Sequence, residues 1–396
     1  MINGLETYKQ RWNIHTDSDI KPGLEAITAA LSQLNNPHRT GKFVHIAGTN
    51  GKGSTAAMLA GILREHGMTV GNFFSPGIDD LHDQIQINGQ AVSTEDLDSA
   101  MDRLSKLQTP LTDFELLTAA AFVIFEQHSP DITIIEAGMG GRFDSTNVID
   151  PVISIIPSIS LEHTNFLGET IEKIAWHKAG VIKKWKPVIV GQVPDAAMKV
   201  IEETADGLHA EIISPGSSLD LELRLKGRHQ QKNALLALEA AKEILQFDFI
   251  NDKAEQGLAD AAIPFRFEEV YPNVIFDGAH NEASIDALID TVRSVYPDKE
   301  IRIVMGILQD KDYITILRKL EGISDHFCFV DFENKRAISS EKLFEESRSK
   351  IKTIANKRDI LPVTEKNEVI IVTGSLYLLS NLRSENSRLF DNFLSK

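Results

Sequence analysis

Hydrophobic residues along this chain follow two alternating patterns. Short, nearly continuous apolar runs indicate strands that are buried on both faces, as in a parallel sheet. The segments between them carry apolar residues three or four positions apart, which predicts helices. In the first half, strands are expected just after Lys42 and at 69–74, 132–135, 152–156 and 187–190, helices at 24–34, 54–65, 94–107, 114–128 and 169–180, and a hairpin at 84–89.

The second half repeats the alternation after an interruption. Residues 209–226 alternate between polar and apolar, which predicts an antiparallel excursion, and helices are expected at 229–245 and 252–261. A domain boundary is expected at 262–266. Beyond it the pattern predicts strands at 273–276, 301–305, 326–330 and 368–372 and helices at 282–295, 312–320 and 341–353.

Strands that alternate with helices predict βαβ units and therefore an α/β fold. We expect a parallel-sheet domain over residues 1–264, followed by a smaller Rossmann-like α/β domain over 268–396. A chain of 396 residues is too long for one ordinary core, which agrees with two domains.

Composition narrows the class of partners. The formal net charge of −16, from 41 basic and 57 acidic residues, argues against a nucleic-acid or acidic-membrane surface. The one cysteine, Cys328, lies in an apolar run and is expected to be a packed core thiol. With no apolar leader at the start of the sequence and no window of membrane-spanning length, we expect a cytoplasmic protein, and nothing demands more than a monomer.

The stretch 42–54 places a buried strand, a Gly/Asn-rich turn and the start of a helix in succession. That geometry cradles phosphate: glycines let backbone N–H groups approach the oxygens, and Lys52 and Ser54 add a charge and a hydroxyl. The usual spacing G-x-x-x-x-G-K-[ST] is not met, because Ile46 stands at its first glycine and Gly53 separates Lys52 from Ser54. A glycine-rich turn without a ligand is the alternative.

Polar residues follow several predicted strands, where open α/β sheets bind ligands. Ser75, Glu136 and His163 hold such positions and could form a Mg²⁺ shell. Each also has an ordinary explanation: a Ser-Pro turn, an ion pair with Arg142, or a helix cap. Lys178 lies near a helix C-terminus, which favours a cation. Residues 277–281 and 310–312 repeat the arrangement in the second domain, which suggests two half-sites closing over a nucleotide.

Taken in order, these motifs resemble the folylpolyglutamate synthase/dihydrofolate synthase family of Mur-type amide ligases. The resemblance runs from about residue 5 to the Thr-Gly-Ser turn at 373–375. It rests on Gly-Thr-Asn-Gly-Lys-Gly-Ser at 48–54, Leu-Thr-Asp-Phe-Glu at 111–115, the glycine-rich stretch 136–147, His-Thr-Asn-Phe-Leu-Gly at 163–168, Lys-Ala-Gly at 178–180, and the motifs at 229–234, 277–281 and 310–312.

The resemblance implies that residues 1–264 form a Mur-ligase-like, parallel-sheet ATPase domain with a P-loop and that 268–396 form a glutamate ligase domain. It also implies a role for each matching residue. Thr49, Asn50, Gly51, Lys52, Gly53 and Ser54 would hold the ATP phosphates, and Asn233, Arg266, Asp277 and His280 would contact ATP. Ser54, Ser75, Glu136 and His163 match magnesium positions. Thr112, Phe114, Glu115, Phe143, Asp144 and Ser145 match stretches that line the folate or pteroate pocket. Lys178 matches a lysine that is carbamylated in the family, and Lys52, His163 and Lys178 are the expected catalytic set.

The implied reaction is ATP- and Mg²⁺-dependent addition of L-glutamate to a folate, or to dihydropteroate, through an acyl phosphate. Lys52 and magnesium would neutralise charge during phosphoryl transfer. Two other functions stay open: a Mur-like ligase with a different carboxylate acceptor, against which the absence of a third domain counts, and a nucleotide-binding module without ligase activity.

Three departures from the family pattern bear on the acceptor. Gly77 stands where the family usually has a histidine, Asp83-Gln84 replaces a usual Glu-Arg, and Phe265 replaces the glycine of a linker Pro-Gly-Arg. The first two fall in the loop beside the substrate, so acceptor specificity or the ordering of that loop is the property they are expected to change.

Overall fold

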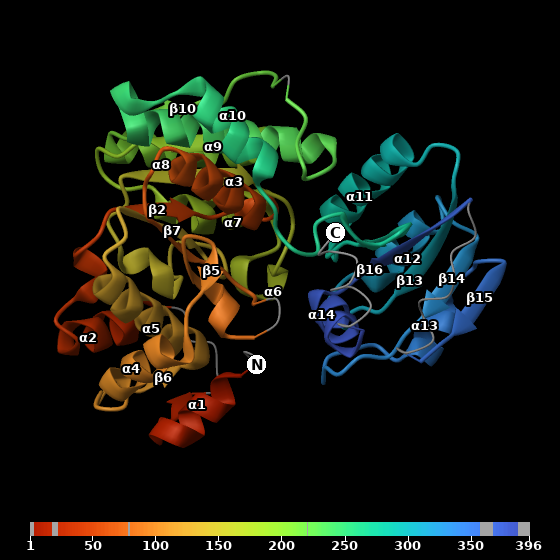
Figure 1. Cartoon of the computed structure of the whole chain (residues 1–396), viewed down its shortest axis with the longest axis horizontal. Helices are drawn as coiled ribbons and strands as arrows, with labels where there is room; N and C mark the ends of the chain where they lie inside the picture. Colours follow the sequence, from red (N-terminus) through yellow and green to blue (C-terminus); the bar gives the residue numbers. More distant parts are fainter. Residues whose placement is uncertain (1–3, 18–22, 78–79, 220, 357–366, 387–396) are drawn as a thin grey trace. The chain divides into compact units, whose positions relative to one another are not determined.

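The computed structural model describes residues 4–17, 23–77, 80–219, 221–356 and 367–386. These residues form two compact units, one made of 1–224 with 230–262 and the other of 225–229 with 263–396. Both are α/β, as the alternating pattern predicts (Figure 1).

The first unit is built on an eight-stranded sheet with the order β10-β9-β8-β2-β7-β3-β4-β5. All neighbours from β10 to β3 are parallel, and β4 and β5 form the expected antiparallel hairpin at the edge. Its strands are β2 (Phe43–Ile46), β3 (Val70–Phe73), β4 (Ile85–Ile87), β5 (Gln90–Ala91), β7 (Ile132–Glu136), β8 (Ile153–Ser158), β9 (Val188–Gln192) and β10 (Ile212–Ile213). A separate parallel pair joins β1 (Thr16–Asp17) to β6 (Leu111–Thr112).

The central strands explain why their sequences are continuously apolar. Every residue of β2 and β7 is buried, and successive side chains point to opposite faces, so helices must cover both faces. The helices of this unit are α1 (Leu5–Trp12), α2 (Glu25–Gln33), α3 (Lys52–Glu65), α4 (Thr94–Leu104), α5 (Asp113–His128), α6 (Thr164–Leu167), α7 (Ile171–Lys178), α8 (Asp195–Leu208), α9 (Arg228–Leu245, whose first two residues belong to the second unit) and α10 (Asn251–Asp260).

Two apolar clusters hold helices to this sheet. One packs α2, α4 and α5 around Phe73 of β3 and Ile135 of β7, and the other packs α7 and α8 against β8 and β9. Helix α5 is apolar nearly all round, so it is buried on most of its surface. Helices α3 and α10 touch through glycines, since a Cβ on Gly61 would lie 2.4 Å from the carbonyl oxygen of Gly257.

The second unit is a six-stranded sheet with the order β11-β12-β16-β13-β14-β15, parallel except for β11 against β12. Cys328 is buried in β14, which confirms a packed core thiol. The elements are β11 (Glu268–Tyr271), β12 (Val274–Phe276), α11 (Glu282–Val295), β13 (Glu300–Met305), α12 (Tyr313–Leu320), β14 (His326–Phe329), α13 (Ser340–Glu346), β15 (Ile351–Ile354), β16 (Glu368–Thr373) and α14 (Leu376–Glu385).

Two predicted elements are wrong. The antiparallel excursion at 209–226 is instead the short strand β10, which follows α8 and pairs parallel to β9, and the described residues after it carry no regular strand. The helix predicted at 341–353 ends at Glu346, and the β-branched residues Ile351, Thr353 and Ile354 form the edge strand β15. Helix α8, held by Ala197, Ile201 and Ala205 at four-residue spacing, was not predicted.

No helix among the described residues is long and apolar enough to cross a membrane.

Candidate functional site

The phosphate loop joins β2 to α3. Gly51 lies at the N-cap of α3 with φ 86°, a left-handed conformation that favours glycine. A Cβ at this position would lie 2.5 Å from Oδ1 of Asn233, so Asn233 of α9 packs directly on the loop. Nζ of Lys52 donates to the carbonyl oxygens of Gly48 (3.0 Å) and Thr49 (3.3 Å). The structure thus brings Asn233, an expected ATP contact, to the expected phosphate cradle.

Glu136 ends β7 directly beside β2, where it pairs in register with Ile46. The carboxylate is buried and lies 3.6 Å from Nζ of Lys52. The guanidinium of Arg142, the partner considered for Glu136, stacks 4.1 Å from the ring of Trp176. Glu136 is therefore placed at the phosphate loop, within reach of a cation held there.

The other expected metal positions lie at element ends. Ser54 is buried in the first turn of α3, and Ser75 follows β3 in a Ser-Pro turn. His163 occupies the N-cap of α6 with φ 46°, yet its side chain makes no capping hydrogen bond, so helix capping does not account for it. Among the described residues, no three His, Cys, Asp or Glu side chains converge on one metal position. The set holds one carboxylate, one imidazole and two hydroxyls.

Lys178 is buried at the end of α7, and its Nζ donates to Oε1 of Glu162 at 2.5 Å. Burial lowers the pKa of Lys178 to about 8; Lys52 acts in the same direction and Glu162 opposes it. Burial acts to raise the pKa of Glu162, but the charges of Lys178 and Lys52 outweigh it and leave that pKa lowered. The pair therefore keeps its charges near neutral pH, although the lysine lies close to losing its proton.

Three of the expected folate-pocket residues stand at the N-terminus of α5. Thr112 and Glu115 form a capping box: Oε2 of Glu115 accepts from the Thr112 amide at 2.8 Å, and the Thr112 hydroxyl accepts from the Glu115 amide at 3.3 Å. Phe114 stacks on Phe73, and its ring closely approaches Gly138, since a Cβ there would lie 2.6 Å from Cζ. Thr112 and Glu115 thus have a local structural role, whereas Phe114 borders the glycine-rich loop.

The glycine-rich loop is held by a buried chain of hydrogen bonds. Oδ1 of Asp144 accepts from the Thr146 hydroxyl at 2.5 Å, and Oδ2 accepts from the Met139 amide at 2.8 Å. The Thr146 hydroxyl in turn lies 2.9 Å from Nε2 of His45 in β2. Because the Thr146 proton is donated to Asp144, we infer that His45 donates through Nε2. Burial lowers the pKa of His45 to about 3, so the ring is neutral.

The other two expected substrate residues, Phe143 and Ser145, flank Asp144 in the sequence. The Ser145 hydroxyl lies 2.8 Å from that of Thr118 in α5, which ties the loop to the helix that carries Phe114. Phe143 is 43% exposed, with its ring centroid 5.8 Å from those of Trp176 and His177. The structure therefore gathers Phe114, Asp144 and Ser145 and leaves Phe143 on the surface.

In the second unit, Asp277 follows β12 and is half-buried. Its carboxylate accepts from the amides of Phe267 and Ala279, both at 2.9 Å. Burial raises the pKa of Asp277, and the charge of Arg266 opposes that rise. Nδ1 of His280 lies 2.8 Å from the carbonyl oxygen of Gly278. Arg266, Asp277 and His280 thus form one neighbourhood.

The departures at 77 and 265 have visible consequences. A Cβ at Gly77 would lie 2.4 Å from the carbonyl oxygen of Asp80 and 2.9 Å from Cγ of Gln84, so this loop has no room for a histidine. Phe265 adopts φ 61°, the conformation for which glycine is suited, and its ring is fully buried 6.0 Å from that of Phe276. Burial of the ring offsets a backbone strain of about 1 kcal/mol.

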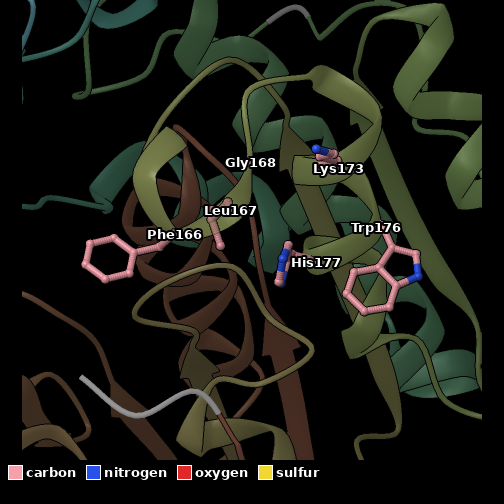
Figure 2. Close-up of a pocket in the computed structure, with 6 residues that line it drawn as sticks. All are labelled: Phe166, Leu167, Gly168, Lys173, Trp176 and His177. Carbon is pink, nitrogen blue, oxygen red and sulfur yellow. The ribbon is translucent and has the colours of Figure 1, made fainter. Parts of the chain in front are cut away.

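A surface hollow of about 320 Å³ lies on α6 and α7. Figure 2 shows His177 between Phe166 on one side and Trp176 on the other. The hollow is lined by Phe166, Leu167, Gly168, Lys173, Trp176 and His177. None of these residues belongs to the phosphate loop. Its connection with the expected site is Phe143, which contacts two of its aromatic residues.

The sequence analysis missed His45, Ser158 and Glu162, although each had a signal. His45 is a polar residue within the buried apolar strand β2, which requires a buried partner, and Ser158 is a polar residue that follows the predicted strand 152–156. Glu162 directly precedes His163, so the same signal, a polar residue after a predicted strand, applies to it.

Comparison with known proteins identifies relatives over nearly the whole chain. Residues 46–192 match the Mur ligase middle domain, and residues 265–376 match the Mur ligase glutamate ligase domain. The dihydrofolate synthase/folylpolyglutamate synthase of Bacillus subtilis is 35% identical over 92% of this chain and 95% of its own length.

Solved structures give the same result. E. coli FolC in complex with DHPP and ADP superposes with a TM-score of 0.87 at 26% identity, covering 97% of this chain and 98% of its own. The bifunctional folylpolyglutamate synthase/dihydrofolate synthase of Yersinia pestis, complexed with AMPPNP and a Mn ion, gives 0.86 at 27% identity, with 97% and 98% covered.

Proposed function

This chain belongs to the folylpolyglutamate synthase/dihydrofolate synthase family, and on that premise we propose that it is an ATP- and Mg²⁺-dependent ligase that adds L-glutamate to a folate. The observation that carries the proposal is the phosphate loop, in which Gly51, Lys52 and Asn233 meet beside the buried Glu136. Structural relatives with nucleotide, metal ion or DHPP bound support the same substrates here.

The chemistry that such a ligase must perform has two steps. ATP transfers its γ-phosphoryl group to the acceptor carboxylate, which gives an acyl phosphate and ADP. The amine of glutamate then attacks the acyl carbon, and phosphate leaves as the amide forms. Lys52 would neutralise charge on the transferring phosphoryl group, after its ammonium exchanged the carbonyl oxygens of Gly48 and Thr49 for phosphate oxygens.

Magnesium would be held by Ser54, Ser75, Glu136 and His163. A buried carboxylate and hydroxyl oxygens suit a hard cation that keeps waters and phosphate oxygens as its other ligands. When bound, the ion would neutralise negative charge on the phosphate oxygens, and the ammonium of Lys52 would contribute to the same neutralisation. Glu136 would then exchange its ion pair with Lys52 for the metal.

Lys178 is proposed to carry a carbamate in the active enzyme. Uptake of CO₂ needs a neutral amine, and burial brings the pKa of Lys178 to about 8, which raises the neutral fraction near physiological pH. Intact-mass measurement under CO₂ tests this. Lys178→Ala is expected to be nearly inactive and partly rescued by a short-chain carboxylate, and the absence of both rescue and added mass would contradict it.

Dihydropteroate is the second candidate acceptor, because the Bacillus relative is named for both activities. The test is ADP release from ATP, Mg²⁺ and glutamate with dihydropteroate and tetrahydrofolate in separate reactions. Turnover with both indicates a bifunctional synthase, and turnover with tetrahydrofolate alone indicates a polyglutamylase. Nucleotide binding without turnover on either acceptor would refute a folate ligase. It would favour a different carboxylate acceptor or a lost activity, with the altered loop at Gly77 and Gln84 as the cause.

We also infer a monomer in the cytoplasm without a nucleic-acid partner, from the net charge of −16 and the single buried cysteine. Light scattering during gel filtration tests the oligomeric state.

A further inference from the structure

Strand β8 ends at Ser158, whose side chain reaches the backbone of the phosphate loop. The Asn50 amide donates to Oγ of Ser158 at 3.0 Å, and the same hydroxyl donates to the Asn50 carbonyl oxygen at 2.9 Å. One hydroxyl thus satisfies both backbone groups of a single loop residue, as a neighbouring strand would. Sequence separation of the two residues is 108, so only the fold brings them together.

A second contact of the same kind lies beside the first. The Thr49 hydroxyl donates to the Ser160 carbonyl oxygen at 3.2 Å and accepts from the Ser160 amide at 3.0 Å. The Thr49 amide donates to the Ser158 carbonyl oxygen at 2.9 Å. Two successive loop residues, Thr49 and Asn50, are therefore hydrogen-bonded to 158–160, each through a hydroxyl that both donates and accepts. We call this set of hydrogen bonds the clasp.

We propose that Ser158 is a positioning residue for the phosphate loop, holding it in its binding conformation before the nucleotide arrives; this rests on the proposed ATP-dependent function. A glycine-rich loop loses much conformational entropy when it is ordered, and a loop that is already fixed does not bear that cost on binding. The clasp also ties the loop to the segment that continues into Glu162 and His163.

The hydroxyl of Ser154 provides a matched control. Ser154 lies four residues earlier on the same strand, is buried, and donates to the Val181 carbonyl oxygen at 2.8 Å without touching the loop. Ser158→Ala and Ser154→Ala each remove from β8 one hydroxyl that hydrogen-bonds to the backbone of another segment. A purely structural role predicts that both variants lower the melting temperature and leave nucleotide affinity alone.

The experiment measures the dissociation constant for ATP with Mg²⁺ by calorimetry, without an acceptor, and the KM for the folate separately. Loss of two hydrogen bonds that preorder the loop is expected to weaken ATP binding about tenfold in Ser158→Ala, with the folate KM unchanged. Ser154→Ala is expected to match the wild type in both. Equal ATP affinity in the two variants would overturn the proposal, whereas a wild-type protein that binds no ATP would overturn the proposed function instead.

Amide exchange in the wild-type protein gives a readout that does not depend on any variant. In the nucleotide-free protein, the amides of Thr49 and Asn50 are expected to be protected in a peptide covering 48–53. Free exchange of these amides without nucleotide would show that the clasp is not formed beforehand, and would overturn the proposal even if Ser158→Ala failed to fold.

Discussion

The ion pair of the buried Lys178 with Glu162, whose side chain is 14% exposed, allows a test of both the direction and the size of an effect on stability. Glu162→Gln removes the counter-charge and keeps the shape of the side chain. Removing one partner of a buried ion pair costs about 3–5 kcal/mol. Lys178 can reduce that cost by losing its proton, because its pKa of about 8 lies roughly one unit above neutral pH, and one unit is worth about 1.4 kcal/mol.

We therefore expect Glu162→Gln to lower the free energy of unfolding by about 2–4 kcal/mol at pH 7, or the melting temperature by roughly 5–15 °C. The pair of Arg103 and Glu126 supplies the control, because it is also within hydrogen-bonding distance at 2.8 Å but its side chains are 30% and 28% exposed. Glu126→Gln should cost less than about 1 kcal/mol.

The pH dependence follows from the lowered pKa of Lys178. Above pH 8 the wild-type lysine loses its proton, the attraction to Glu162 disappears, and the difference between Glu162→Gln and wild type shrinks. On the acid side, the pKa of Glu162 is lowered by Lys178, so the stabilisation is lost as the pH falls below the ordinary range of a glutamate.

The assay is thermal unfolding followed by circular dichroism, in CO₂-free buffer with EDTA, from pH 6 to 9.5. A difference that does not vary with pH, or one no larger than that of Glu126→Gln, would refute the reasoning. A gain in stability on adding bicarbonate to Glu162→Gln, but not to wild type, is what a carbamate on Lys178 predicts, because Glu162 would then face a second negative charge.

Three further predictions concern the loops around the site. Gly51→Ala should weaken ATP binding more than tenfold in calorimetry, because the new Cβ is strained at a positive φ and collides with Asn233. Gly67→Ala is the control: it has φ 87° but open space around its Cβ, so it should cost about 1 kcal/mol of stability and leave ATP affinity unchanged. Gly77→His should lower the melting temperature and fail to lower the folate KM, since the loop leaves no space for the side chain; a lower KM would contradict this. His45→Leu should raise the folate KM several-fold and leave the ATP KM unchanged in steady-state kinetics. Because the pKa of His45 is about 3, protonation of this histidine should not change the wild-type folate KM between pH 5 and 9. A parallel rise in both KM values would indicate general damage instead.

Local patterns in the sequence determined most elements of the fold. Apolar runs such as 132–135 marked strands whose two faces are both covered, and the α/β class follows from their alternation with helices. The errors also have local causes. The strand β15 is short, exposed and rich in β-branched residues, so it has no apolar period to distinguish it from the end of a helix.

The sequence also determined that Lys52, Glu136, His163 and Lys178 are polar residues at the ends of predicted elements, where ligands of such sheets bind. What these side chains contact was decided by the tertiary structure alone. Lys178 and Glu162 lie 16 residues apart, and Asn50 and Ser158 lie 108 apart. Periodicity states which face of a strand or helix a residue occupies, but it carries no information about which distant segment covers that face. The pairing depends on sheet order, and that order is set by the packing of the whole unit.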